Sequence, residues 1–108
     1  MPSIYRVLGQ SAPSAATDTT LYTVPIGTSA VVSTLNICNR AATTGSFRVA
    51  VRPAGAALAN QHYIAFDTPI PANDSITITA GISLAATDVI TVYGSASLSF
   101  VAFGAEIT

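Results

Sequence analysis

The residues that most resemble a catalytic set are the one histidine of the chain, His62, and an aspartate five positions later, Asp67, in a sequence rich in serine. These residue types can form a Ser-His-Asp triad, in which histidine activates a serine hydroxyl and aspartate orients the histidine. The chain has no nucleophile-elbow motif that would place a serine beside His62. Serine is also so frequent that the combination carries little information. We therefore predict no enzymatic activity and no catalytic residues.

Metal and cofactor sites have no better support. One histidine, one cysteine and five acidic residues lack the close spacing of a metal-ligand set. No glycine-rich phosphate loop precedes a helix. Cys38 falls within a strand pattern, where we expect a small buried hydrophobe rather than a reactive thiol. We expect no metal and no cofactor.

Arginine and tyrosine are the remaining residues that favour binding. Arg48 and Arg52 share one face of an expected strand and Arg40 precedes it, so the three are candidate anion or partner contacts. A planar guanidinium suits bidentate pairing with a carboxylate, and we expect such pairs across a sheet or a subunit contact. A carbohydrate-binding or host-surface-binding module built from Tyr63, His62 and Arg52 is the alternative function, although strand tyrosines more often serve packing or interfaces.

The composition favours self-association. Charged residues make up 8% of the chain and the net charge is -1, whereas an ordinary soluble domain is about 25% charged. We expect neither nucleic acid nor an anionic membrane as a partner. A monomer with so little charge is poorly protected against association. We therefore expect a homo-oligomer, and a trimer is our first expectation for its size. The absence of disulfides and of a signal-peptide pattern favours assembly in a reducing cytoplasm.

Short β-strands are the elements that must position these residues. Residues 21–40 predict a strand, a Pro-Ile-Gly turn and a long alternating strand, together a hairpin. In the long strand we expect Val31, Leu35 and Ile37 on the core face and Val32 on the opposite face.

Further strand signals occur at spacings near the 8–12 residues typical of a sandwich or barrel. They cover residues 4–8, 46–52, 61–67, 75–80, 82–84, 89–93 and 98–103, and the last two are expected to form a hairpin. We predict an all-β fold, one antiparallel β-sandwich of about eight short strands, Ig-like or jelly-roll. It spans residues 1–108, with 9–20 as a loop or extended arm. The candidate interface or core side chains are Tyr22, Val31, Leu35, Ile37, Phe47, Val49, Ile78, Val92, Phe100 and Phe103.

Three long segments and the ending of the chain form a distinctive series: LYTVPIGTSAVVSTLNICN, FRVAVRPAGAALANQHYIAFD, PANDSITITAGISLAATDVITVY and FGAEI. Over about residues 19–107 this series resembles small structural proteins of tailed bacteriophages. The resemblance implies a non-enzymatic β-sandwich component of the virion, such as a capsid decoration (cement) protein or a tail, baseplate or fibre protein. It would bind itself and other virion proteins and be assembled in the cytoplasm of the bacterial host. The series contains no chemical motif, so no functional residue is transferred.

Overall fold

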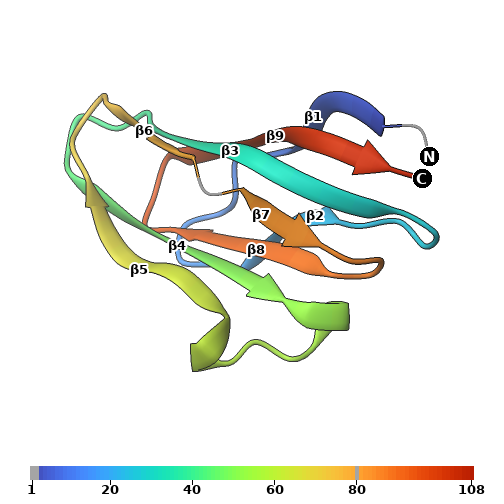
Figure 1. The fold of residues 1–108 in the computed structure, drawn as a ribbon. Helices are drawn as coiled ribbons and strands as arrows, with labels where there is room; N and C mark the ends of the chain where they lie inside the picture. The colour runs from blue at the N-terminus through green and yellow to red at the C-terminus, as the bar shows by residue number, and fades with distance from the viewer. Residues whose placement is uncertain (1–2, 80) are drawn as a thin grey trace.

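A computed structural model describes residues 3–79 and 81–108 and shows two antiparallel sheets packed face to face (Figure 1). Sheet A has the order β1 (Ser3–Ser11), β9 (Leu98–Ile107), β3 (Ser29–Asn39), β6 (Ser75–Ile78), and β7 (Ile82–Leu84) also pairs with β3. Sheet B has the order β2 (Thr19–Thr23), β8 (Val89–Gly94), β4 (Gly45–Arg52), β5 (Tyr63–Ile70). Two single 3-10 turns, η1 (Pro53–Gly55) and η2 (Asn60–His62), lie between β4 and β5. The predicted all-β sandwich is confirmed.

The strand pairing identifies the sandwich as a jelly roll. β1 pairs with β9, β2 with β8, β3 with β6 and β7, and β4 with β5. The chain is thus one long antiparallel ribbon that turns back between β4 and β5. The ladders β3–β9 and β4–β8 roll this ribbon into two sheets. The strand expected at 75–80 ends at Ile78, and Ala80, its expected last residue, lies outside the described residues.

Both hairpins expected from the sequence are wrong. The turn after β2 exists, because the Thr28 N–H donates to the Pro25 carbonyl (3.2 Å). However, β2 belongs to sheet B and β3 to sheet A, and β8 and β9 are divided in the same way. Turn residues between two alternating segments mark a reversal of the chain, and they do not distinguish a hairpin from a corner that crosses between sheets.

The first strand is longer than the sequence indicated. β1 continues to Ser11, so the connection to β2 covers residues 12–18 instead of 9–20. A bulge between Val7 and Gly9 adds one residue to the ladder with β9. Gly9 then passes so close to β2 that a Cβ atom there would overlap the Leu21 carbonyl oxygen. Gly9, which falls in the segment expected as a loop or arm, instead permits this close approach within β1.

A second bulge reverses the faces of β3. The ladder with β9 shifts between Val32 and Thr34, so the extra residue is Ser33. One inserted residue changes the phase of the alternation. Val32 is consequently buried together with Leu35, while Val31 lies on the outer face and is only half-buried. The expectation that Val31 shares the core face is wrong for this reason.

The core between the sheets is mostly apolar. Phe47 of β4 and Phe100 of β9 meet edge to face, with ring centroids 6.5 Å apart. Of the candidate side chains, seven are buried, Ile78 is half-buried against the core, and Phe103 is exposed. The seven are Tyr22, Leu35, Ile37, Phe47, Val49, Val92 and Phe100.

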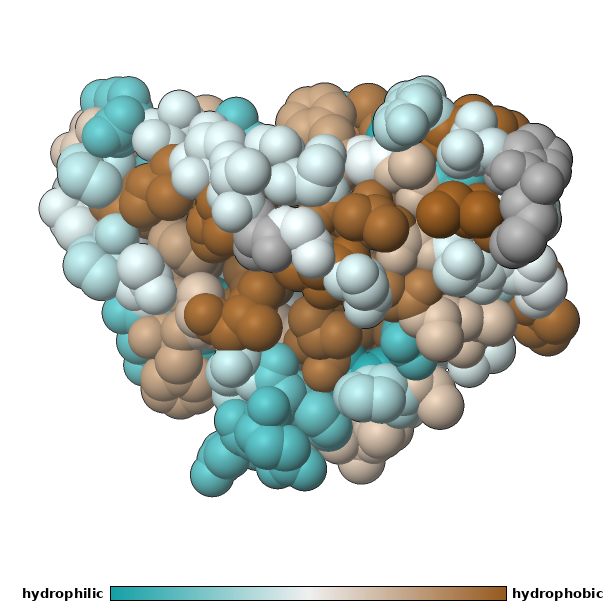
Figure 2. Space-filling view, in the orientation of Figure 1, coloured by the Kyte–Doolittle hydropathy of each residue, from teal (hydrophilic) through white to brown (hydrophobic). Residues whose placement is uncertain are grey.

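The space-filling view shows how polarity is distributed on the side that carries β5, β6 and β7 (Figure 2). Hydrophilic side chains gather around the loop between β4 and β5, and apolar ones lie across the middle, between the sheets. β6 and β7 contribute the half-buried Ile76, Ile78 and Ile82, which pack against the core. The short strands thus cover part of the core on this side of the sandwich.

Candidate functional site

The residues that suggested catalysis have separate partners. His62 lies in η2, where its Nδ1 accepts the Ala59 N–H at 3.1 Å. The Asp67 carboxylate instead accepts hydrogen bonds from Arg48. Cys38, expected in the core, is half-buried on β3, on the face opposite Ile37. Among the described residues, no group of three or more His, Cys, Asp and Glu is arranged to hold a metal ion.

In residues 3–79 and 81–108, no helix is long and apolar enough to cross a bilayer.

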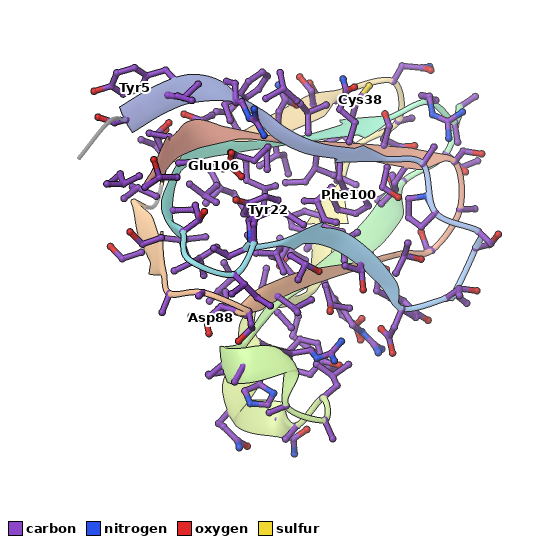
Figure 3. The ribbon with its side chains drawn as sticks, turned by 90° about the vertical axis from the view of Figure 1, so that its right-hand side faces the viewer. Tyr5, Tyr22, Cys38, Asp88, Phe100 and Glu106 are labelled. Atoms are coloured by element: carbon purple, nitrogen blue, oxygen red, sulfur yellow. The ribbon has the colours of Figure 1, made fainter. Side chains whose placement is uncertain are left out.

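Exposed apolar side chains concentrate at the edge of sheet A formed by β1. Seven large apolar side chains are exposed in the described residues, and four of them lie here. They are Ile4, Tyr5 and Val7 of β1 and Phe103 of β9, which we call the β1-edge patch. Tyr5 is 83% exposed, and Figure 3 shows it projecting away from the body of the sandwich.

A shallow hollow of about 280 Å³ lies beside Tyr5 on the outer face of sheet A. Its lining is mostly apolar or small: Ser3, Tyr5, Val31, Ser33, Gly104, Ala105 and Ile107. The β3 bulge places Val31 here, and the Ser33 hydroxyl donates to the Phe103 carbonyl at 3.3 Å. A Cβ atom at position 104 would overlap the Val31 carbonyl oxygen, and Gly104 avoids this overlap because it has no side chain. The hollow therefore depends on a bulge and a glycine that meet across the β3–β9 ladder.

An ionic network centred on the buried Glu106 carboxylate fixes β1 to both sheets. The Tyr22 hydroxyl donates to Glu106 Oε2 at 2.6 Å, and Arg6 Nη2 lies 2.8 Å from Glu106 Oε1. Burial, together with the hydrogen bond to the Glu106 carboxylate, raises the pKa of Tyr22 above its usual range. Figure 3 shows the Tyr22 and Glu106 side chains directed toward one another between the sheets. The network thus joins β1, β9 and β2, and it positions the β1-edge patch.

A second cluster occupies the outer face of sheet B. The Arg48 guanidinium lies 4.2 Å from the centroid of Phe66 and 4.3 Å from that of Tyr93. Its Nε lies 2.6 Å from Asp67 Oδ1 and its Nη2 3.3 Å from Asp67 Oδ2. The β4–β5 ladder shifts at this point and Asp67 has a φ of 49°, so two consecutive side chains contact the same arginine. The hydrogen bond to Asp67 raises the pKa of Arg48, which stays charged.

Next to this cluster, the Tyr63 and Phe66 rings meet edge to face with centroids 4.9 Å apart. Together with Asn60 they line a hollow of about 350 Å³. Phe66 is 54% exposed. The arrangement offers an aromatic surface beside an amide.

The other two candidate arginines are used within the chain. Arg52 donates to two carbonyl oxygens of the loop after β4 and to the Thr91 hydroxyl (3.1 Å). Arg40 donates to the Leu98 carbonyl at 3.5 Å. Of the three, Arg48 alone forms an ion pair in the part of the chain that is described. The structure therefore distributes them over three separate sets of contacts.

Sequence reasoning missed Glu106 and Asp67 as partners of Arg6 and Arg48. The one local signal at Glu106 is a carboxylate at a position where the strand alternation requires an inward side chain. Tyr22 and Glu106 are 84 positions apart, so their contact follows from the rolling of the ribbon and not from any spacing.

No family model matches this chain, and a search of curated proteins gave no match. Among solved structures, it is similar to a chain in the structure of infectious bursal disease virus, Gx strain, with a TM-score of 0.51 and 13% sequence identity. The match covers 97% of this chain and 30% of that chain. At this identity the similarity shows the fold alone. The present chain spans less than a third of the length of the viral chain.

Proposed function

We propose that the protein is a non-enzymatic structural component of a tailed-phage virion. It acts by associating with copies of itself and by docking on a larger viral scaffold, as a capsid decoration protein or as part of a tail, baseplate or fibre. Assembly takes place in the cytoplasm of the bacterial host.

The observation that carries this proposal is a jelly roll with an exposed apolar edge and very little charge. Jelly rolls are a common architecture of viral capsid proteins, and the chain is similar in fold to part of a chain in a virus structure. A monomer with 8% charged residues and the exposed side chains of the β1-edge patch has a surface suited to subunit contacts.

Localisation on particles tests the proposal. Virions of the phage that encodes the chain are purified on a density gradient, analysed by quantitative mass spectrometry, and labelled with a gold-conjugated antibody against the protein. We expect the protein to co-purify at a fixed copy number per particle, and the label to occupy one defined position. Purified infectious particles without the protein would refute a virion role.

Carbohydrate binding is the second candidate, and the exposed Tyr63–Phe66 pair beside Asn60 favours it. A sugar ring stacks on an aromatic face while amide groups hydrogen-bond its hydroxyls. The contacts differ from those expected from the sequence, because Arg52 and the His62 Nδ1 are engaged within the chain. A glycan array tests this function: specific hits that disappear in Phe66→Ala support it, and no hits with the native protein refute it.

A further inference from the structure

Within residues 3–79 and 81–108, no strand pairs with the outer edge of β1. β1 is the terminal strand of sheet A, and all five of its residues before the bulge, Ser3–Val7, are exposed. On an edge strand, alternate N–H and C=O groups point away from the sheet and have no strand to pair with.

The other sheet edges carry the features that normally prevent strand pairing, namely short strands, prolines, charges and bulges. β6 and β7 have only four and three residues. β5 contains Pro69 and is interrupted by the bulge at Asp67, whose carboxylate binds Arg48. β2 contains a bulge between Thr20 and Tyr22, and the end of β1 passes against its Leu21.

The Ser3–Val7 segment lacks these features. It contains no proline or lysine, and its one charged side chain, Arg6, is paired with the buried Glu106. Three of its five residues are large, apolar and exposed. An edge that is open, apolar and without a free charge is suited to pairing with another strand.

We propose that β1 pairs with β1 of a second copy of this chain, antiparallel across a two-fold axis near Tyr5. The axis places Tyr5 opposite Tyr5 of the second copy, and Ile4 opposite Arg6. The two copies of sheet A then form one continuous sheet. This inference rests on the proposed function, because it names the contact through which the subunits associate.

Self-complementarity is the reason for choosing a second copy as the partner. An antiparallel strand pair is unchanged by a two-fold rotation, so the edge and the β1-edge patch of one copy meet the same features of the other. Tyr5 and Val7 of both copies then cover one another on the outer face, beside Phe103 and the hollow. Ion pairing of Arg6 within its own chain also reduces the like-charge repulsion that a two-fold contact would otherwise create.

The expected interface is small. A five-residue strand pair extends roughly 16 Å, and each large aromatic side chain buries at most about 150–250 Å². The contact therefore lies at or below the roughly 800 Å² per partner of a standard interface, and we expect a dissociation constant on the order of micromolar. Two-fold pairing yields a dimer, whereas the trimer expected from composition would require β1 to meet a different edge.

Sedimentation equilibrium of the intact chain tests the inference. The variant is Tyr5→Lys, and the matched control is Ile26→Lys, because Ile26 is 88% exposed in the turn between β2 and β3. We expect a species of twice the 11.0 kDa chain mass at high concentration. We also expect a dissociation constant at least roughly tenfold weaker for Tyr5→Lys and unchanged for Ile26→Lys. Circular dichroism confirms that both variants are folded.

Amide hydrogen exchange gives a second readout specific to the edge. Pairing predicts that exchange of amides in residues 3–7 slows as protein concentration rises, while exchange in the turn around Ile26 does not change. Each of four results would overturn the inference. In sedimentation, these are a monomer at the highest concentration, a mass of three chains, and equal effects of both variants. In hydrogen exchange, it is unchanged exchange in residues 3–7. A monomeric protein found on particles contradicts the pairing and leaves the virion role intact, and a dimer absent from particles does the reverse.

Discussion

Asn39, at the end of β3, is the residue whose replacement best tests how the loops at one end of the jelly roll are held. Its side chain is 1% exposed. The amide nitrogen donates to the Thr43 carbonyl at 2.9 Å and to the carbonyls of Ile70 and Pro71 at 3.2 Å each. Its Oδ1 accepts the Ala41 N–H at 2.9 Å. One side chain thus joins β3, the loop before β4 and the loop after β5.

The expected cost of Asn39→Ala follows from these contacts. A typical hydrogen bond contributes about 0.5–1.5 kcal/mol net, and a buried group left without a partner costs about 1–3 kcal/mol. Because water can reach only part of this site after truncation, we expect the free energy of unfolding to fall by about 3–5 kcal/mol. Asn39→Asp should cost at least as much at neutral pH, since a carboxylate would face three carbonyl oxygens without a donor.

Urea denaturation followed by far-UV circular dichroism measures this loss, at one low protein concentration so that self-association does not contribute. The control is Asn36→Ala, which removes the same side chain from a half-buried position on the outer face of the same strand. We expect the control to lose less than about 1 kcal/mol. A loss below about 1 kcal/mol for Asn39→Ala, or equal losses for the two variants, would refute the reasoning.

Three further predictions concern the core and the buried network. Gly104→Ala should lower the free energy of unfolding by roughly 1–3 kcal/mol in a urea titration, because the new Cβ meets the backbone of Val31; an unchanged titration would contradict the close approach. Phe47→Ala should cost about 3–5 kcal/mol in the same assay, and a loss below roughly 0.5 kcal/mol would place Phe47 outside the core. The pKa of Tyr22 is raised in the folded chain, so above about pH 10 the unfolded chain releases a proton that the folded chain keeps. The contribution of Tyr22 should therefore lower the free energy of unfolding by about 1.4 kcal/mol for each further pH unit. Tyr22→Phe should lack this contribution, and identical alkaline slopes for the two proteins would contradict it.

The sequence was sufficient for the fold class because alternation is a local signal. Phe47 and Val49 on β4, and Phe100 on β9, follow an uninterrupted period of two, and all three are buried. The same rule gave the wrong face for Val31, because the extra residue, Ser33, is neither glycine nor proline and leaves no mark in the pattern. Register depends on which strand lies alongside, and that information is not local.

The candidate sites were harder to predict for a related reason. The three arginines on and before β4 were recognised, but their partners come from β5, β8 and β9. Whether Arg48 and Arg52 form one anion patch depends on the loop after β4. This loop folds back toward the start of β8, where the Asp88 carboxylate accepts the Ala54 N–H at 2.8 Å. The pairing of strands within each sheet, which a single sequence does not specify, decides these contacts.

The outward apolar side chains of the two sheets are covered by the chain to different extents. On sheet B, Arg48 stacks between Phe66 and Tyr93 and is neutralised by Asp67, so the outer aromatic groups are partly covered by the chain itself.

On sheet A, the bulges at Leu8 and Ser33 keep the inner face apolar while they direct Val7 and Val31 outward. The nearest charge, Arg6, is bound to Glu106 and does not shield them. Apolar surface that the chain leaves uncovered is stabilised only when another molecule covers it. The surface chemistry therefore favours sheet A, at its β1 edge, as the face for subunit contacts, and it leaves sheet B as the face available to solvent or to a ligand.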